Sequence, residues 1–174
     1  MKERTLVVGL GNPILGDDGV GWQVAKVIEA QLGSGFGDLE IIYCSIGGIA
    51  LMEQLVGYDQ ALLIDSISTG KFPVGATCSL PLGELPSGST AHSGSAHDTN
   101  LQTALRVGRS MGYGLPGLIW VVGIETEAVF EFSEKCSPAI EASIPRAADV
   151  VIGVLDSWRK KAVGEPLAAC TTCQ

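Results

Sequence analysis

Basic residues are scarce in this sequence of 174 residues: 11 Lys and Arg stand against 19 Asp and Glu, which gives a net charge of −8. A field of that sign repels a phosphate backbone and an anionic membrane surface, so we expect neither nucleic acid nor a membrane as a partner. The sequence also lacks a bilayer-spanning apolar run and an amino-terminal signal pattern. Its five cysteines are odd in number and scattered, apart from Cys170 and Cys173. These absences predict a cytoplasmic protein without a disulfide framework.

Charged residues of both signs make up only 17% of the chain, whereas hydrophobic residues make up 46%. Such a composition argues against disorder and suits a compact domain with buried strands. Hydrophobic runs alternate with segments of helical period, which indicates βαβ units. We therefore predict an α/β fold of three layers, α/β/α, in which helices flank a mostly parallel, five-stranded twisted sheet. A single monomeric domain is expected over residues 1–163, with a disordered tail over residues 164–174.

Five strands are expected, and the fourth is placed at an edge because it contains Pro81; they cover residues 5–10, 39–45, 61–67, 76–82 and 118–124. The first helix is expected to start near Asp17 or Asp18 and to end at Gly33. A later helix is expected to bury a stripe made of Leu101, Ala104, Leu105, Val107 and Met111. The last helix is expected to start after Ser137, and Pro145 should kink or divide it.

A Gly-rich segment, residues 9–21, connects the first strand to the first helix and reads Gly-Leu-Gly-Asn-Pro-Ile-Leu-Gly-Asp-Asp-Gly-Val-Gly. A glycine turn at a helix start suits a phosphate, so a nucleotide-binding domain is one alternative. The spacing matches neither the dinucleotide fingerprint nor a P-loop, and two carboxylates, Asp17 and Asp18, stand where the phosphate would lie. Carboxylates at this place are helix caps or metal ligands, and only one of the two can be the N-cap.

A second carboxylate position is Asp65, which interrupts a buried apolar strand near its end. Its burial is costly unless it binds loop amides, a charged partner or a cation. The only two histidines, His92 and His97, lie in a Gly- and Ser-rich loop over residues 83–98, and His97 directly precedes a helix. Two carboxylates and one imidazole suit a borderline ion such as nickel, zinc or manganese. The residues thus predict a metal site of Asp18, Asp65 and His97 at the carboxyl edge of the sheet.

The Gly-rich segment closely resembles the opening motif of the hydrogenase maturation endopeptidases. Further motifs of that family are similar to residues 63–65 (Leu-Ile-Asp), 95–97 (Ser-Ala-His), 121–125 (Val-Val-Gly-Ile-Glu) and 137–140 (Ser-Pro-Ala-Ile). The motifs follow one another in the family's order, from about residue 5 to about residue 160. The resemblance therefore covers most of the chain.

This resemblance implies an endopeptidase, a hydrolase that removes the C-terminal extension of a nickel-loaded nickel–iron hydrogenase large-subunit precursor. It implies Asp18, Asp65 and His97 as the metal-contacting and catalytic residues, with Asp17 as a cap or as a residue behind Asp18. Nickel is implied to arrive with the precursor, and another divalent ion could occupy the site in isolation. The ion could polarise the scissile carbonyl or activate water, or Asp18 or Asp65 could serve as general base.

Two further interpretations compete with this one. A nickel-sensing chaperone or binding module would use the same site without cleavage. The start of the chain, residues 7–13, also resembles the peptidyl-tRNA hydrolases, whose esterase site needs a His soon after the first turn. No His precedes His92, and the net charge of −8 opposes RNA binding, so this second interpretation is disfavoured.

Overall fold

The computed structural model describes residues 3–33, 38–85, 101–127 and 132–162. Its five-stranded sheet has the order β2-β1-β3-β5-β4. The strands are β1 (Thr5–Leu10), β2 (Leu39–Cys44), β3 (Gln60–Ile67), β4 (Thr77–Pro81) and β5 (Leu118–Glu125). All neighbours are parallel except β4, which runs antiparallel to β5 at the edge. The predicted mostly parallel sheet and the edge position of the Pro81 strand are confirmed.

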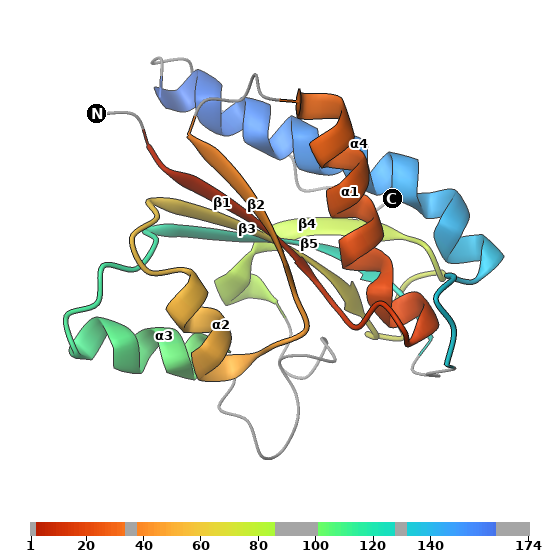
Figure 1. Cartoon of the computed structure of the whole chain (residues 1–174), viewed down its shortest axis with the longest axis horizontal. Coiled ribbons are helices and arrows are strands. Elements are labelled where there is room, and N and C mark those ends of the chain that lie inside the picture. The colour runs from red at the N-terminus through yellow and green to blue at the C-terminus, as the bar shows by residue number, and fades with distance from the viewer. Residues whose placement is uncertain (1–2, 34–37, 86–100, 128–131, 163–174) are drawn as a thin grey trace.

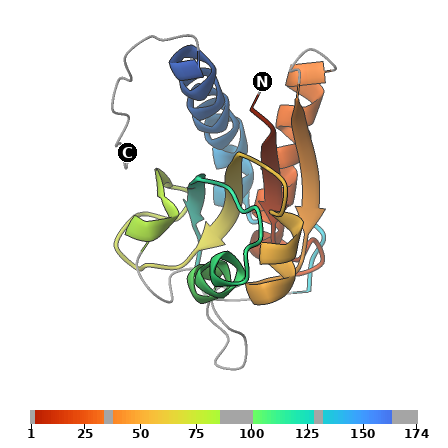
Figure 2. The same cartoon turned by 90° about the vertical axis from the view of Figure 1, so that its left-hand side faces the viewer.

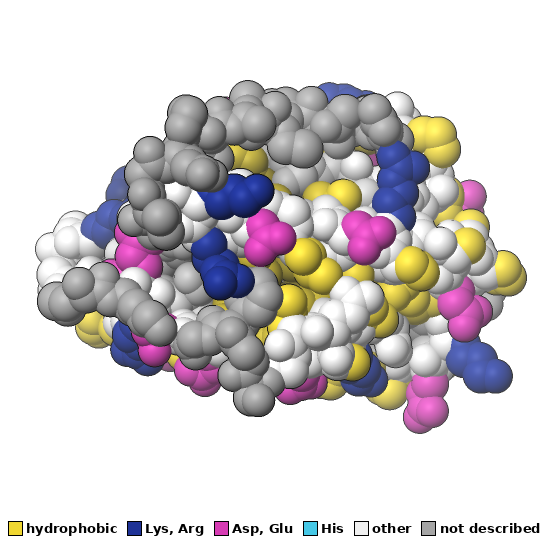
Figure 3. Space-filling view, turned by 90° about the horizontal axis from the view of Figure 1, so that it is seen from above, with side chains coloured by type: hydrophobic (Ala, Val, Ile, Leu, Met, Phe, Trp, Pro, Cys, Tyr) yellow, Lys and Arg dark blue, Asp and Glu magenta, His cyan; other side chains and the backbone are white. Residues whose placement is uncertain are grey.

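Helices cover both faces of this sheet, as Figures 1 and 2 show, so the predicted three layers are confirmed. One face carries α1 (Val20–Leu32) and α4 (Pro138–Ala162), and the other carries α2 (Gly48–Gln54) and α3 (Leu101–Ser110). Short 3-10 turns, η1 (Gly16–Gly19) and η3 (Leu82–Glu84), follow β1 and β4. Within the described ranges, no helix combines the length and the apolar character that a membrane crossing requires. The outer face of α1 and α4 carries acidic and basic side chains interspersed among hydrophobic ones (Figure 3).

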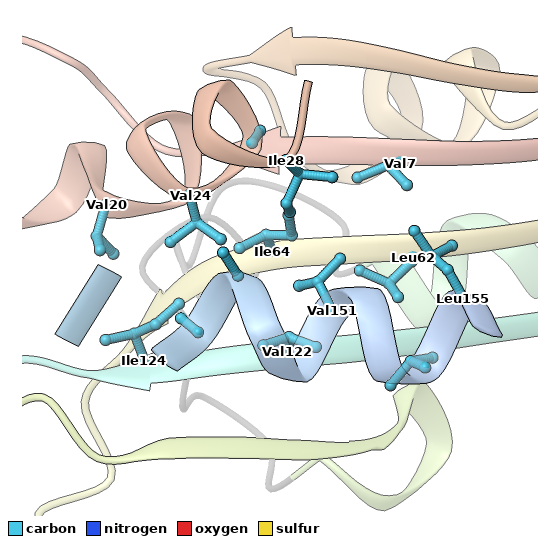
Figure 4. Close-up of a cluster of buried hydrophobic side chains, with 14 of the residues drawn as sticks. Val7, Val20, Val24, Ile28, Leu62, Ile64, Val122, Ile124, Val151 and Leu155 are labelled. Carbon is cyan, nitrogen blue, oxygen red and sulfur yellow. The ribbon is translucent and has the colours of Figure 1, made fainter. Parts of the chain in front are cut away.

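Two hydrophobic cores result from the alternation of side chains along each strand. Leu62 and Ile64 of β3 pack with Val24 and Val151 under α1 and α4 (Figure 4). The intervening Leu63 packs instead with α2 and α3. Because both faces are covered, the central strands are apolar almost throughout, which explains their continuous hydrophobic runs.

One prediction about the helices is wrong. Val107 and Met111 are exposed, because α3 buries a stripe that runs through Leu101, Ala104, Leu105 and Gly108 instead. Gly108 fits there because it has no Cβ, which would lie 2.9 Å from the sulfur of Met52. At Pro145 the sequence left two alternatives, a kink or a division, and the structure excludes the division because α4 continues through Pro145 as one helix. A kink at this proline stays a prediction.

Other sequence predictions fall on residues that the structure does not describe. These are the larger part of the 83–98 loop, whose first residues form η3, and the tail over residues 164–174. The division of the chain into a domain and a tail therefore stays a prediction.

The amino end of α1 lies directly against the backbone of β1 and β3. A Cβ on Gly21 would lie 2.2 Å from the carbonyl oxygen of Leu10 and 2.3 Å from that of Ile64. On the strand side, a Cβ on Gly9 would lie 2.8 Å from the carbonyl oxygen of Gly21. No side chain fits between these backbones, so the glycines set how closely the helix approaches the sheet.

We expect Gly21→Ala to lower the free energy of unfolding by about 3 kcal/mol, because the methyl group must push α1 away from two strands. Gly153→Ala in α4 is the matched control, since Gly153 is exposed and nothing lies within 4 Å of its Cβ position. It should raise the free energy of unfolding by up to about 1 kcal/mol through helix propensity. Urea unfolding followed by circular dichroism measures both, and equal effects of the two substitutions would contradict the close approach.

Candidate functional site

The strand order creates a switch point between β1 and β3. The chain goes from β1 to β2 on one side of this pair and from β3 to β4 on the other, so the connections diverge between the carboxyl ends of β1 and β3. Open α/β sheets bind their ligands in the crevice at such a point. Asp18 follows β1 and Asp65 lies near the end of β3, so two of the three predicted site residues flank this point.

Asp18 is held by a tightly folded turn. The turn closes on itself at Gly11, whose φ is +127° and whose Cβ would lie 1.9 Å from the carbonyl oxygen of Asp18. The Asp18 side chain is only 3% exposed. Its Oδ2 accepts a hydrogen bond from the backbone N–H of Asn12 at 2.8 Å, and its Oδ1 accepts one from the hydroxyl of Ser66 at 3.2 Å. These two bonds orient the carboxylate against β3.

Asp65 is the residue next to Ser66, and it is 2% exposed. Because side chains alternate along a strand, Asp65 is on the Leu63 face, toward α2 and α3, whereas Ser66 is on the opposite face. The structure therefore brings Asp18 to the residue beside Asp65. The two carboxylates approach the end of β3 from different parts of the chain.

Of the alternatives that the sequence left for Asp17 and Asp18, the structure excludes a cap of α1. The N-cap of α1 is Gly19, and no side chain caps the helix there, because Asp17 and Asp18 both lie in the turn η1 that precedes the helix. Asp17 instead accepts a hydrogen bond from the backbone N–H of Ser137 at 2.6 Å, just before α4. Asp17 thus connects the turn beside Asp18 to the start of the last helix.

His97 and His92 lie outside the described residues. Among the residues whose placement is known, no group of three His, Cys, Asp or Glu side chains could hold a metal ion. The three-residue site of Asp18, Asp65 and His97 therefore stays a prediction.

Glu125, at the carboxyl end of β5, is a buried acid to which the sequence analysis assigned no role. Its carboxylate accepts hydrogen bonds from the backbone N–H groups of Thr69 and Gly70 and from the Thr69 hydroxyl, at 2.8, 2.7 and 2.8 Å. Glu125 therefore fixes the loop that follows β3. The signal that singled out Asp65, one acid at the end of an apolar strand, also describes Glu125 and could have found it.

Two cysteine thiols near this edge of the sheet are poor nucleophiles. Burial, together with the negative charges of Asp17 and Glu141, raises the pKa of the Cys136 thiol to about 11. Burial also raises the pKa of Cys44. A nucleophilic cysteine needs a lowered pKa, so neither thiol suits covalent catalysis.

A sequence model of the hydrogenase maturation protease family matches residues 24–154, three quarters of the chain. The matched range contains Asp65 and His97 and begins after Asp18. Among curated proteins, the hydrogenase expression/formation protein HupD of Rhizobium leguminosarum bv. viciae is 24% identical over 168 residues, which cover 95% of this chain and 81% of the relative. The HupD protein of Rhodobacter capsulatus is 22% identical, over 90% of this chain and 73% of the relative.

Solved structures share the fold. The hydrogenase maturating endopeptidase HybD from E. coli superposes with a TM-score of 0.68 at 23% identity, covering 88% of this chain and 92% of that one. The hydrogenase maturation protease HybD from Thermococcus kodakarensis superposes with a TM-score of 0.60 at 17% identity, covering 87% and 99%. At these identities the likeness concerns the arrangement of the sheet and its helices.

We expect Glu125→Gln to lower the free energy of unfolding by about 3 kcal/mol, because the amide presents a donor to groups that are themselves donors. Glu134→Gln, at an exposed position, is the matched control and should change stability by less than about 0.5 kcal/mol. Urea unfolding measures both variants. Equal unfolding midpoints for Glu125→Gln and the unmodified chain would show that the carboxylate does not hold the loop.

The raised pKa of Cys136 predicts slow alkylation. A thiol reacts as thiolate, so the rate for Cys136 should still rise steeply between pH 9 and pH 10, where a thiol with the ordinary pKa begins to level off. Glu141→Gln removes one nearby negative charge, so it should lower the pKa and speed the reaction at pH 9. Iodoacetamide labelling followed by peptide mass spectrometry measures the Cys136 rate. A labelling rate that levels off near pH 9 would show that the pKa of Cys136 is not raised.

Proposed function

Since the chain belongs to the hydrogenase maturation protease family and is thus an endopeptidase that processes a hydrogenase precursor, we propose that it removes the C-terminal extension of the large subunit after nickel has been inserted. In this proposal the nickel of the precursor contacts Asp18, Asp65 and His97. The ion is part of the substrate. Cleavage then waits until the precursor carries it.

The position of Asp18 is the observation that carries the proposal. Two hydrogen bonds orient this buried carboxylate against β3, at Ser66, the residue that follows Asp65, near the switch point of the sheet. Burying one acid is costly, and two acids that approach the same strand end are favoured when a cation lies between them. Two carboxylates and an imidazole are donors that suit a borderline ion such as nickel.

The start of α3 supports His97 as the third ligand. Leu101, the first residue of α3, packs in the same core as Leu63, on the face where Asp65 stands. His97 precedes Leu101 by four residues, which span at most about 14 Å. This short connection supports the proposal that His97 joins Asp65 on that face.

The proposed chemistry is hydrolysis of one peptide bond beside the nickel site. Asp18, Asp65 and His97 hold the ion and thereby position the precursor. Water adds to the scissile carbonyl carbon and the C–N bond breaks. One carboxylate of the Asp18/Asp65 pair takes the proton of the water and passes it to the leaving amine. The acidic site favours a precursor that carries a positive ion over an empty one.

We further propose that the chain works in the cytoplasm as a monomer and binds no nucleic acid. Its net charge of −8 opposes contact with phosphate, which supports the last point. Sedimentation velocity measures the mass of the particle in solution.

We expect Asp18→Asn, Asp65→Asn and His97→Gln each to slow cleavage of the nickel-loaded precursor about 100-fold or more, because each removes a group that positions the ion or moves a proton. Asp149→Asn, exposed on α4, and His92→Gln are the matched controls and should cleave at the unmodified rate. The mass of the large subunit reports loss of the extension.

A parallel incubation with nickel-free precursor tests the role of the ion. The unmodified chain should leave that precursor intact. Cleavage at equal rates with and without nickel would contradict nickel dependence, and cleavage by all three variants at the unmodified rate would remove them from the site.

A further inference from the structure

We propose that four exposed apolar side chains at the carboxyl edge of the sheet form the surface on which an apolar segment of the hydrogenase precursor docks, next to the bond that is cut. These residues, called here the carboxyl-edge patch, are Ile14, Phe72, Val74 and Phe132, with exposed fractions of 50%, 38%, 37% and 88%. The inference rests on the proposed function, because it names where the substrate of that site is held.

The topology places the patch at the same edge as the candidate site. Ile14 lies in the turn after β1, Phe72 and Val74 lie in the loop after β3, and Phe132 lies after β5. These three strands are adjacent and parallel, so the segments that follow them emerge at one edge of the sheet. In Figure 1 this edge is on the right, where β1 leads into α1.

Backbone hydrogen bonds hold Ile14 beside Phe132. The N–H of Ser133 donates to the carbonyl oxygen of Ile14 at 3.1 Å, and the N–H of Gly16 donates to the carbonyl oxygen of Ser133 at 2.7 Å. The bond between Asp17 and the Ser137 N–H anchors the same segment again, four residues later. Phe132 therefore adjoins a residue whose backbone is bound to the turn that carries Asp18.

The loop that carries Phe72 and Val74 is anchored as well. Glu125 holds its first part through Thr69 and Gly70, and the N–H of Gly75 donates to the backbone oxygen of Glu125 at 2.8 Å. A Cβ on Gly75 would lie 3.1 Å from the carbonyl oxygen of Ala139, in the first turn of α4. The backbone next to Val74 and the turn that carries Ile14 thus both lie near the start of α4.

The chemistry of the patch favours an apolar partner. Large apolar side chains on anchored backbone lose little entropy when they are covered, and aromatic anchors of this kind carry much of the energy of protein interfaces. The turn over residues 12–16 (Asn-Pro-Ile-Leu-Gly) has no charge, and the nearest charges after Phe132 are of opposite sign, Glu134 and Lys135. Continuity with the edge where the precursor is cleaved identifies that precursor as the occupant.

The test compares two double variants in binding to the precursor. Ile14→Ser/Phe132→Ser removes the two apolar side chains of the patch whose backbone segments are hydrogen-bonded to each other. The control, Val107→Ser/Met111→Ser, removes two exposed side chains on and just after α3, with exposed fractions of 45% and 66%. Biolayer interferometry gives Kd for nickel-free and nickel-loaded large-subunit precursor, and product mass gives kcat at saturating precursor. We expect the patch variant to raise Kd at least tenfold for both forms with kcat within twofold. The control variant should change neither.

The nickel-free arm separates this inference from the proposed function. Asp18→Asn should raise Kd for nickel-loaded precursor and leave Kd for nickel-free precursor unchanged. If Kd for nickel-loaded precursor does not change, the proposed nickel contact is wrong, but the docking surface is unaffected. An unchanged Kd in the patch variant would overturn the proposed docking surface. Weaker binding of nickel-loaded precursor only, with unchanged binding of nickel-free precursor, would overturn it as well. A chain that is dimeric in sedimentation and becomes monomeric in the patch variant, with Kd unchanged, also overturns it. Ile14→Val/Phe132→Leu, which keeps apolar side chains, should retain Kd within threefold.

Discussion

The contact between the backbone of α1 and the backbones of β1 and β3 is the constraint on which the rest of the site depends. Gly9 and Gly21 allow the helix to start against the strand ends, with no side chain between. The segment between these two glycines is therefore tightly folded, and Gly11 lies against the backbone of Asp18. This packing directs the Asp18 carboxylate at β3. A bulkier residue at any of these glycines would move the carboxylate away from Ser66, so backbone packing determines where the proposed chemistry takes place.

Acidic residues at the strand ends have different surroundings although their sequence signatures are alike. Glu125 is surrounded by donors of the following loop, which shows a structural role. Asp18 belongs to the turn after β1 but is hydrogen-bonded to Ser66, the residue after Asp65, so two acids from separate segments meet at the end of one strand. Whether such an acid is structural or functional depends on its neighbours in the folded protein. An acid at the end of an apolar run in the sequence therefore identifies a candidate site residue but does not show its role.

Local patterns were enough to predict the sheet and much of the candidate site. Alternating apolar runs indicated the strands, and Pro81 indicated the edge. Carboxylates after the first strand and near the end of the third indicated Asp18 and Asp65, which the structure brings to one strand end. The remaining points concern contacts that no local pattern encodes. Asp17 binds the backbone of Ser137, 120 residues away, instead of capping the next helix. The buried stripe of α3 likewise depends on Gly108 meeting Met52 of the neighbouring helix.

The bonds from residues 14–17 to residues 133–137 also affect the order in which the molecule can fold. Closing so long a loop has an entropic cost that only an assembled sheet offsets, so these contacts form after β1, β3 and β5 have paired. During synthesis the amino-terminal turn emerges early but reaches its final geometry only when the start of α4 has been made. The newly made chain therefore gains its hydrolytic competence late, when most of its own folding is complete.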